Sequence, residues 1–419
     1  MFNRFTGRAT LFLLILSPFC AALATDDNGQ TALTSGSVPT YTADVPAAPL
    51  AGPRANRQTT LFNRNLQSKG DVAVPDKIYT TEEIRSAKPL EWSTPSPVNN
   101  LETSDSPEDA PVSTDPPREG TSGKPNAAAD EDAQMDFADQ WLLIEDLEQL
   151  EKSGLLPDQT SEPAGDNADS SLDAEGADFS TEDITFGTQD IYTPYRGNYW
   201  TSTWTTYPHR AIGKLLIDGG GYCTAQVISP KNIIVTAAHC VYDGGWYGGW
   251  TFVPAERYGV APYGQFRWAR ADILPGWVSP GGRRYDVALI QLANNSSGHP
   301  VSYYTGWLGW RINYPYVRNL HSFGYASNIS TQYTSVCTAE SFYAGCEGTD
   351  VLVKGCNMTY GSSGGGWLDV YRPFESGSMN YVESVVSGPS CAGGFGQTYV
   401  GPRFSSDNFG TLCGRYGGC

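Results

Sequence analysis

The chain has 419 residues and a formal net charge of −18, but the charge is spread very unevenly along the sequence. Residues 101–186 contain 24 acidic and 3 basic side chains, whereas residues 187–419 contain 13 acidic and 15 basic ones. Neither part has a run rich in Lys and Arg, which argues against nucleic acid as a partner.

The first residues have the pattern of an export signal. A positively charged start leads into an apolar run at 11–16, and Ala22 and Ala24 fit a small-x-small cleavage site, which predicts a signal peptide over 1–24. A membrane anchor is the alternative, but Pro18 interrupts a stretch that is already too short to span a bilayer. No later stretch of the sequence is apolar enough to span a bilayer. We therefore expect a secreted, extracellular protein without a membrane span.

Residues 25–187 are rich in Pro, Ser, Thr, Ala and acidic residues and poor in aliphatic ones. Such a composition buries too little apolar surface to offset chain entropy, so we expect an acidic, mostly disordered pro-segment. A second possibility is that this segment itself binds a mineral or a cell surface.

A stretch at 130–153 departs from this composition. Its apolar residues recur every three or four positions: Phe137, Trp141, Ile144, Leu147 and Leu150. Acidic residues at the start and Gly154 after the end are typical of a helix, here of about six turns. The apolar stripe could self-associate. We favour docking on the following domain, which makes the pro-segment a partner of its own chain.

From residue 188 to residue 419 short apolar runs alternate with clusters of Gly, Asn, Asp and Pro. The clearest runs are 212–217, 225–228, 233–236, 287–292 and 384–387. Many short strands with regular turn signals predict an all-β domain, either an antiparallel barrel or a sandwich.

The cysteines agree with export. Cys20 lies in the signal, and the other eight lie between Cys223 and Cys419, which allows up to four disulfides. A bond between Cys223 and Cys240 would close the loop that holds His239. There is no Cys-x2-Cys pair, and His239 beside Cys240 is not zinc-ligand spacing, so we expect no metal and no cofactor.

A glycine-rich serine motif, Gly-Ser-Ser-Gly-Gly, occupies residues 361–365. Glycines there let the backbone turn tightly and bring N–H groups towards a substrate carbonyl. By itself the motif is common in loops, and it also fits the Gly-x-Ser-x-Gly elbow of α/β-hydrolases. Those enzymes place their histidine after the serine, whereas the last histidine here is His321, so the elbow is excluded.

A histidine and an acidic residue precede this serine motif, and both lie next to predicted strands. His239 lies in Thr-Ala-Ala-His-Cys at 236–240, directly after a predicted strand. Asp286 precedes the apolar run at 287–292, where a carboxylate alone would be read as a strand cap. It follows His239 and precedes Ser363, which makes it the candidate orienting acid.

Together these motifs resemble the chymotrypsin/trypsin superfamily, in which the chain order is His, Asp, Ser. The sequence Cys-Asn-Met-Thr at 356–359 is closest to the bacterial and fungal trypsin-like and glutamyl-endopeptidase branch. The resemblance covers about Tyr207 to Phe404. It implies two six-stranded antiparallel β-barrels and a monomeric serine endopeptidase that acts on proteins or peptides and is made as a precursor. A non-catalytic homologue that binds proteins is the alternative.

The resemblance assigns the roles. Ser363 is the nucleophile, His239 the general base, and Asp286 the residue that orients the imidazole. The backbone N–H groups of Gly361 and Ser363 form the oxyanion hole. Ser387 is expected to line the substrate cleft and to donate a hydrogen bond to Asp286.

Three residues depart from the family pattern. Ser362 stands where many relatives carry Asp, so activation should not depend on an ion pair with a freed N-terminus. Asn357 is neither the acid of trypsins nor apolar, and Val386 is not the histidine of glutamyl endopeptidases, so neither cleavage preference is expected. With Ser387, we place Asn357 and Gln397 in the substrate pocket.

The resemblance also suggests the remaining disulfide pairs. These are Cys337–Cys346 and Cys356–Cys391, with Cys413–Cys419 left as a short C-terminal loop. Each disulfide is expected to stabilise the fold by roughly 2–4 kcal/mol.

Overall fold

The structure, a computed structural model, describes residues 59–63, 67–69, 72–74, 77–91, 110–111, 113–133, 149, 193–196, 204–278, 282–390 and 398–419. For residues 67–69, 72–74, 193–196 and 346 it describes the backbone alone. All described residues belong to the compact unit Ala51–Cys419. The predicted signal peptide, the boundary at 187/188 and nearly all of the predicted helix at 130–153 lie outside them.

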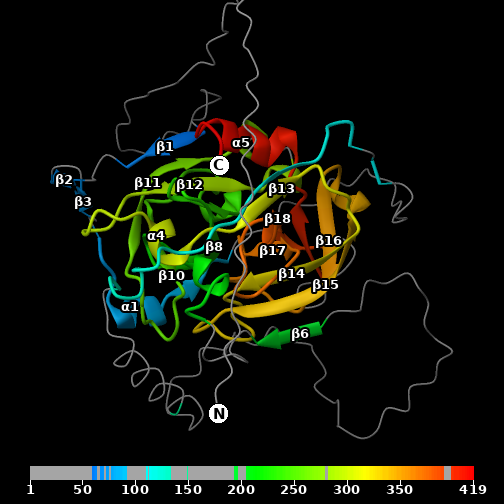
Figure 1. Cartoon of the computed structure of the whole chain (residues 1–419). Helices are drawn as coiled ribbons and strands as arrows, with labels where there is room; N and C mark the ends of the chain where they lie inside the picture. The colour runs from blue at the N-terminus through cyan, green and yellow to red at the C-terminus, as the bar shows by residue number, and fades with distance from the viewer. Residues whose placement is uncertain are drawn as a thin grey trace, which may run out of the picture. The chain divides into compact units, whose positions relative to one another are not determined.

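The first sheet closes into a barrel (Figure 1). It consists of β1 (Thr60–Phe62), β4 (Lys88–Pro89), β7 (Ile212–Ile217), β8 (Gly221–Ser229), β9 (Ile233–Thr236), β10 (Trp250–Pro254), β11 (Phe266–Asp272) and β12 (Ala288–Leu292). Six of these strands pair antiparallel in the closed order β7-β8-β9-β12-β11-β10. The mostly β fold with a closed six-stranded antiparallel barrel confirms the fold class predicted from the sequence.

The second sheet has ten strands. It consists of β5 (Arg118–Gly120), β6 (Thr193–Arg196), β13 (Gly309–Ile312), β14 (Arg318–Gly324), β15 (Ser335–Tyr343), β16 (Val351–Gly355), β17 (Gly366–Asp369), β18 (Tyr381–Val385), β19 (Gly388–Pro389) and β20 (Thr398–Pro402). Six of them pair in the order β20-β16-β15-β14-β17-β18. The N–H of Phe404, just after β20, donates to the carbonyl of Glu383 in β18 at 3.0 Å, which links the two ends of this row.

The remaining elements are short. They include the hairpin β2 (Gln67–Lys69) and β3 (Val72–Val74), the helices α1 (Thr81–Arg85), α3 (Pro275–Val278), α4 (Val301–Thr305) and α5 (Thr411–Gly414), and single 3-10 or π turns. Among the described residues no helix is both long and apolar enough to cross a membrane.

The apolar runs of the sequence become the buried strands. All six residues of β7 and all four residues of β9 are buried, and β12 forms within the run 287–292. β18 overlaps the run 384–387 only at residues 384–385, because the strand begins earlier, at Tyr381. Continuous burial arises because one face of each strand points into a barrel and the other is covered by neighbouring segments. The strands therefore carry the candidate site on a rigid core.

Parts of the region before residue 188 are built into the sheets, contrary to the expectation of disorder for these residues. β1 pairs antiparallel with β11, β4 pairs parallel with β8, and β5 pairs antiparallel with β13. In Figure 1 the blue strand β1 lies along β11. The composition missed these strands because the partner strands, and not the segment's own apolar residues, supply most of the pairing surface.

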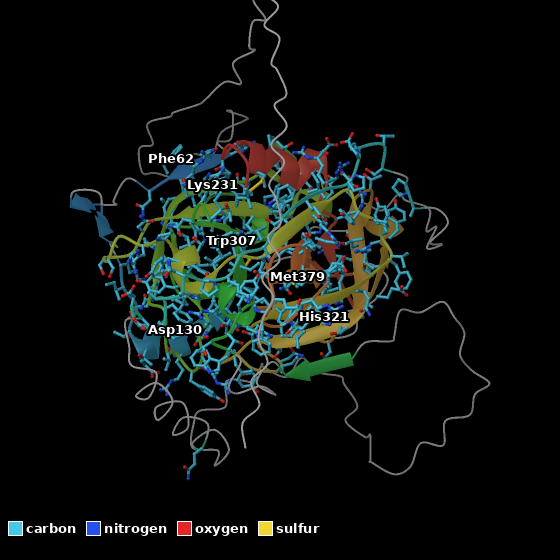
Figure 2. The ribbon with its side chains drawn as sticks, in the orientation of Figure 1. Phe62, Asp130, Lys231, Trp307, His321 and Met379 are labelled. Carbon is cyan, nitrogen blue, oxygen red and sulfur yellow. A yellow bond between two sulfur atoms is a disulfide. The ribbon has the colours of Figure 1, made fainter. Side chains whose placement is uncertain are left out.

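Residues 121–130 pack on the same domain (Figure 2 labels Asp130 and Trp307). The Trp307 indole N–H donates to the Thr121 carbonyl at 3.0 Å, and a Cβ on Gly123 would lie 2.2 Å from the Trp307 ring. Asp130 forms a 2.7 Å ion pair with the buried Arg210. Only glycine at position 123 allows the backbone to lie this close to the Trp307 ring, so the contact depends on the sequence of this segment.

The disulfides partly correct the sequence analysis. Cys223–Cys240 and Cys413–Cys419 form as expected, but Cys337 bonds to Cys356. The pairs Cys337–Cys346 and Cys356–Cys391 are therefore wrong. Cys337 lies in β15 and Cys356 directly follows the neighbouring strand β16, so their Cα atoms are 5.8 Å apart. Pairing of these two strands cannot be read from cysteine spacing. The side chains of Cys346 and Cys391 lie outside the described part.

Glu383 in β18 gives this domain a pH-dependent stability. Burial raises its pKa to about 7, although Arg318 and Arg311 act in the opposite direction. A raised carboxyl pKa means that the folded state binds more protons than the unfolded state between about pH 4.5 and 7, so stability falls as the pH rises through this window.

We therefore expect Glu383→Gln to raise the free energy of unfolding at pH 8 by up to about 3 kcal/mol and to flatten its dependence between pH 5 and 8. Urea unfolding across this range measures the effect. Glu340→Gln, on an exposed glutamate of β15, is the control. An unchanged slope in Glu383→Gln would show that this carboxyl does not titrate there.

Candidate active site

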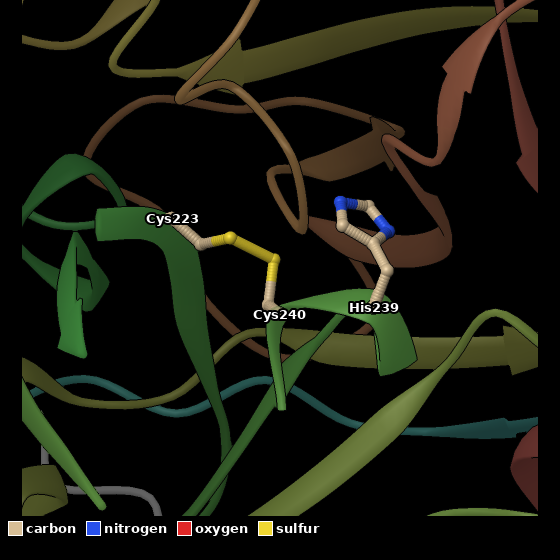
Figure 3. Close-up of side chains that lie close together, drawn as sticks. All are labelled: Cys223, His239 and Cys240. Carbon is tan, nitrogen blue, oxygen red and sulfur yellow. A yellow bond between two sulfur atoms is a disulfide. The ribbon is translucent and has the colours of Figure 1, made fainter. Parts of the chain in front are cut away.

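His239 lies on a single 3-10 turn, Ala238–Cys240, that follows β9 directly. The disulfide from Cys240 to Cys223 in β8 anchors this turn to the barrel (Figure 3). The ligand atoms of these three residues lie within 4.8 Å of one another, which resembles a metal-binding group. Because both sulfurs are bonded to each other, neither is a thiolate, and the group does not fit a metal.

Asp286 holds His239 at two points. Its Oδ1 accepts the backbone N–H of His239 at 2.9 Å, and its Oδ2 lies 2.8 Å from Nδ1 of the imidazole. Neither side chain is exposed. Since a carboxylate can accept but not donate, Nδ1 carries the proton in this contact, which leaves Nε2 with its lone pair when the ring is neutral. Ser387 donates to Oδ2 of Asp286, as expected from the sequence.

The serine motif lies in the loop between β16 and β17 and packs against the strand that leads to His239. Gly364 has a φ of +80°, and a Cβ there would lie 2.0 Å from Oγ1 of Thr236 and 2.9 Å from the Ala237 nitrogen. The Ser363 carbonyl accepts the N–H of Thr224 in β8 at 2.8 Å. Only glycine permits this approach and this φ, so the motif brings the buried Ser363 to the region of His239.

The same loop is tied to the strand that precedes Ser387. The N–H of Gly364 donates to the Val386 carbonyl at 2.8 Å, and the N–H of Val386 donates to the Gly365 carbonyl at 2.9 Å. Ser387, the next residue, donates to Asp286. The three motif residues, far apart in sequence, are thus joined through shared neighbours.

Gly361 begins the loop with a φ of +83°. Its carbonyl accepts from Oγ1 of Thr224 at 2.8 Å, which turns the carbonyl towards β8. Within the described residues, the N–H groups of Gly361 and Ser363 donate to no backbone carbonyl. Two such donors in one loop are suited to bind a developing negative charge on oxygen.

Ser362 has a local partner. Its buried hydroxyl donates to the carbonyl of Thr359 at 2.6 Å. The expectation that activation does not depend on an acid at this position stays a prediction.

The expected substrate pocket is described in part. Asn357 is half-buried, and its carbonyl accepts from the side chain of Asn328 at 2.7 Å. Gln397 lies outside the described residues. Around Ser387 the structure adds a pair that the sequence analysis missed: Arg283 lies 3.4 Å from Ser387 Oγ and forms a 2.9 Å ion pair with Glu347. The position of Arg283 three residues before Asp286 was the sequence feature that could have placed it near the site.

No curated protein sequence matches the chain. Among solved structures, protease Anisep from Arthrobacter nicotinovorans is 26% identical, with 51% of this chain and 94% of that chain covered and a TM-score of 0.43. The thermostable serine protease AL20 from an extremophilic microorganism is 24% identical, with coverages of 47% and 93% and a TM-score of 0.42. A Glu endopeptidase in complex with MPD is 17% identical, with coverages of 54% and 96% and a TM-score of 0.44.

A family model gives the assignment. Residues 200–365, which include His239, Asp286 and Ser363, match the family model described as Trypsin. This segment contains the closed barrel strands and the serine motif. Residues 200–365 are therefore similar to the trypsin family, which is the resemblance that the sequence motifs predicted.

Proposed function

We infer that the protein is a secreted serine endopeptidase that cleaves peptide bonds through Ser363, His239 and Asp286. The observation that carries this proposal is the fully buried contact of 2.8 Å between Nδ1 of His239 and Oδ2 of Asp286, next to the loop of Ser363. A serine hydroxyl is a poor nucleophile without a base, and an imidazole whose Nδ1 is held by a carboxylate presents Nε2 as that base.

The reaction proceeds in two stages. Ser363 Oγ attacks the scissile carbonyl while His239 takes its proton, and the C–N bond then breaks as His239 returns that proton to the leaving amine. This leaves an acyl-enzyme on Ser363. A water, deprotonated by His239, then attacks the ester carbonyl. The C–O bond to Ser363 breaks, His239 returns the proton to Ser363 Oγ, and the acyl group leaves as a carboxylic acid.

Two sets of groups stabilise the charges that develop during the reaction. The N–H groups of Gly361 and Ser363 bind the oxyanion that forms in each stage, and Asp286 stabilises the imidazolium. Ser387, by its hydrogen bond to the same carboxylate, keeps Asp286 in place.

The remaining elements of the proposal rest on the sequence. The signal pattern at 1–24 supports secretion, and the acidic region before residue 188 supports synthesis as a precursor. A binding protein without catalysis is the alternative. The presence of all three residues of the triad favours the enzyme.

Labelling of Ser363 tests the proposal. The secreted full-length protein and its processed products are treated with a fluorophosphonate probe, and the labelled peptide is identified by mass spectrometry. We expect one labelled peptide, carrying the probe on Ser363, and parallel loss of peptidase activity on a mixed peptide library. Absence of both labelling and turnover would overturn the proposal.

A further inference from the structure

An ion pair is fully buried beneath residues 77–91. Nζ of Lys214 in β7 lies 3.0 Å from Oε2 of Glu256, and neither side chain is exposed. Burial lowers the pKa of Lys214 and raises that of Glu256, since both charges have lost their water. A buried pair of this kind is costly unless further hydrogen bonds satisfy both groups.

Those hydrogen bonds come partly from residues 77–91. The carbonyl of Ile84 in α1 accepts from Nζ of Lys214 at 3.2 Å. The other oxygen of Glu256, Oε1, accepts the N–H of Gly259 at 2.6 Å. Gly259 has a φ of +81°, and a Cβ there would lie 2.3 Å from the Thr81 carbonyl oxygen, so α1 sits directly on this turn.

Segment 77–91 is shaped for this position. Thr80 and Glu83 form a capping box at the start of α1. Ile84 is 1% exposed and packs with Tyr222 and Tyr325 in one apolar cluster. After the helix, the N–H of Leu90 donates to the Tyr222 carbonyl at 2.9 Å.

Two tyrosines connect the ion pair to the serine loop. Nζ of Lys214 lies 5.1 Å from the ring centroid of Tyr222 and 5.3 Å from that of Tyr325. The Tyr325 hydroxyl donates to the Glu256 carbonyl at 2.7 Å, and the Tyr222 hydroxyl donates to the Tyr325 carbonyl at 3.1 Å.

Gly361 rests on this pair of tyrosines. A Cβ on Gly361 would lie 2.4 Å from the Tyr325 carbonyl oxygen and 2.5 Å from the Tyr222 hydroxyl oxygen. The N–H of Tyr325 and the carbonyl of Gly361 also share Oγ1 of Thr224, at 3.0 and 2.8 Å. A shift of Tyr222 or Tyr325 would therefore change the position of the Gly361 backbone.

We propose that residues 77–91 remain part of the active enzyme and, through Lys214, Tyr222 and Tyr325, position the N–H of Gly361 in the oxyanion hole. This inference rests on the proposed function. Lys214, Glu256, Tyr222 and Tyr325 are positioning residues that touch no substrate. The contacts of Gly361 with Tyr222 and Tyr325 add to the hydrogen bonds that tie Gly364 and Gly365 to Val386.

Loss of the segment has a defined consequence. Without α1, Lys214 loses its hydrogen bond to the Ile84 carbonyl, and water reaches the Lys214–Glu256 pair. The pair then lacks one of the hydrogen bonds that offset the cost of its burial. The tyrosines then lose their packing partner, and Gly361 loses its fixed conformation.

The first experiment removes one hydroxyl. Tyr222→Phe keeps the ring but deletes the atom that Gly361 contacts, and Tyr263→Phe deletes another buried hydroxyl, which donates to the Thr205 carbonyl at 2.9 Å. We expect kcat on a peptide substrate to fall about ten-fold in Tyr222→Phe with KM unchanged, because the oxyanion exists only near the transition state. Tyr263→Phe should keep its kcat.

The second experiment displaces α1. Gly259→Ala places a methyl group against Thr81, whereas Gly244→Ala introduces alanine at a comparable positive φ of +64° with nothing within 4 Å. Both carry the backbone strain, but only the first should lower kcat. The active, probe-labelled wild-type enzyme is also separated under denaturing conditions, and its mass spectrum should contain a polypeptide that includes residues 77–91.

The outcomes separate the two proposals. If Ser363 is not labelled in the wild type, the proposed function fails. If Ser363 is labelled and turns over substrate but the kcat of Tyr222→Phe equals that of Tyr263→Phe, the positioning role is overturned. Fully active enzyme that lacks residues 77–91 would overturn it equally.

Discussion

Replacing Ser363 with alanine is expected to lower kcat by about a million-fold, since removal of the nucleophile of a serine triad costs as much as removal of the whole triad. The fold should survive, because the contacts that hold the loop are made by the backbone of Ser363 and by Gly364. Steady-state hydrolysis of a peptide substrate by the purified protein measures the effect.

Ser362→Ala is the matched control. It removes a buried hydroxyl from the neighbouring residue, but that hydroxyl donates to the Thr359 carbonyl. We expect its kcat to stay within about ten-fold of the wild type, the range of an indirect effect on positioning. Should Ser363→Ala keep its activity while Ser362→Ala loses it, the nucleophile would have been assigned to the wrong serine.

Asp286→Asn is expected to lower kcat by about ten-thousand-fold at neutral pH. The carboxylate accepts from both the backbone N–H and Nδ1 of His239. An amide that turns its NH₂ group towards the ring favours the tautomer protonated at Nε2, in which the imidazole can no longer take a proton from Ser363. The dependence of kcat on pH, compared with the wild type, measures the effect.

Asp272→Asn separates this effect from the loss of a buried charge. Asp272 in β11 is also fully buried and pairs with Arg270 and Arg415. We expect this variant to lose thermal stability but to keep the kcat of the folded enzyme. Equal losses of kcat in Asp272→Asn and Asp286→Asn would contradict a specific role of Asp286.

Local sequence predicted the strands and motifs well, for a physical reason. A run such as 212–217 is apolar enough to require burial, and Gly364 is required where a positive φ and a close approach coincide. An apolar run and a positive φ are properties of a few consecutive residues. They therefore leave a pattern that can be read without the fold.

Contacts between distant segments left no such pattern. The Cys337–Cys356 bond depends on the register of two strands, and the Arg283–Glu347 pair depends on two loops that meet only in the folded chain. The strands before residue 188 were missed for the same reason. β5 is Arg-Glu-Gly, whose composition is that of a loop, and it becomes a strand by pairing with β13.

The pairing of β1 with β11 also means that β1 is made well before its partner strand. Thr60 and Asp272 are 212 residues apart, so a ribosome adding 5–20 residues per second makes the second partner roughly 10–40 s after the first. During this time β1 has no strand to join. β1 can therefore join the barrel only after β11 has been made, which is later than the synthesis of β7, β8, β9 and β10.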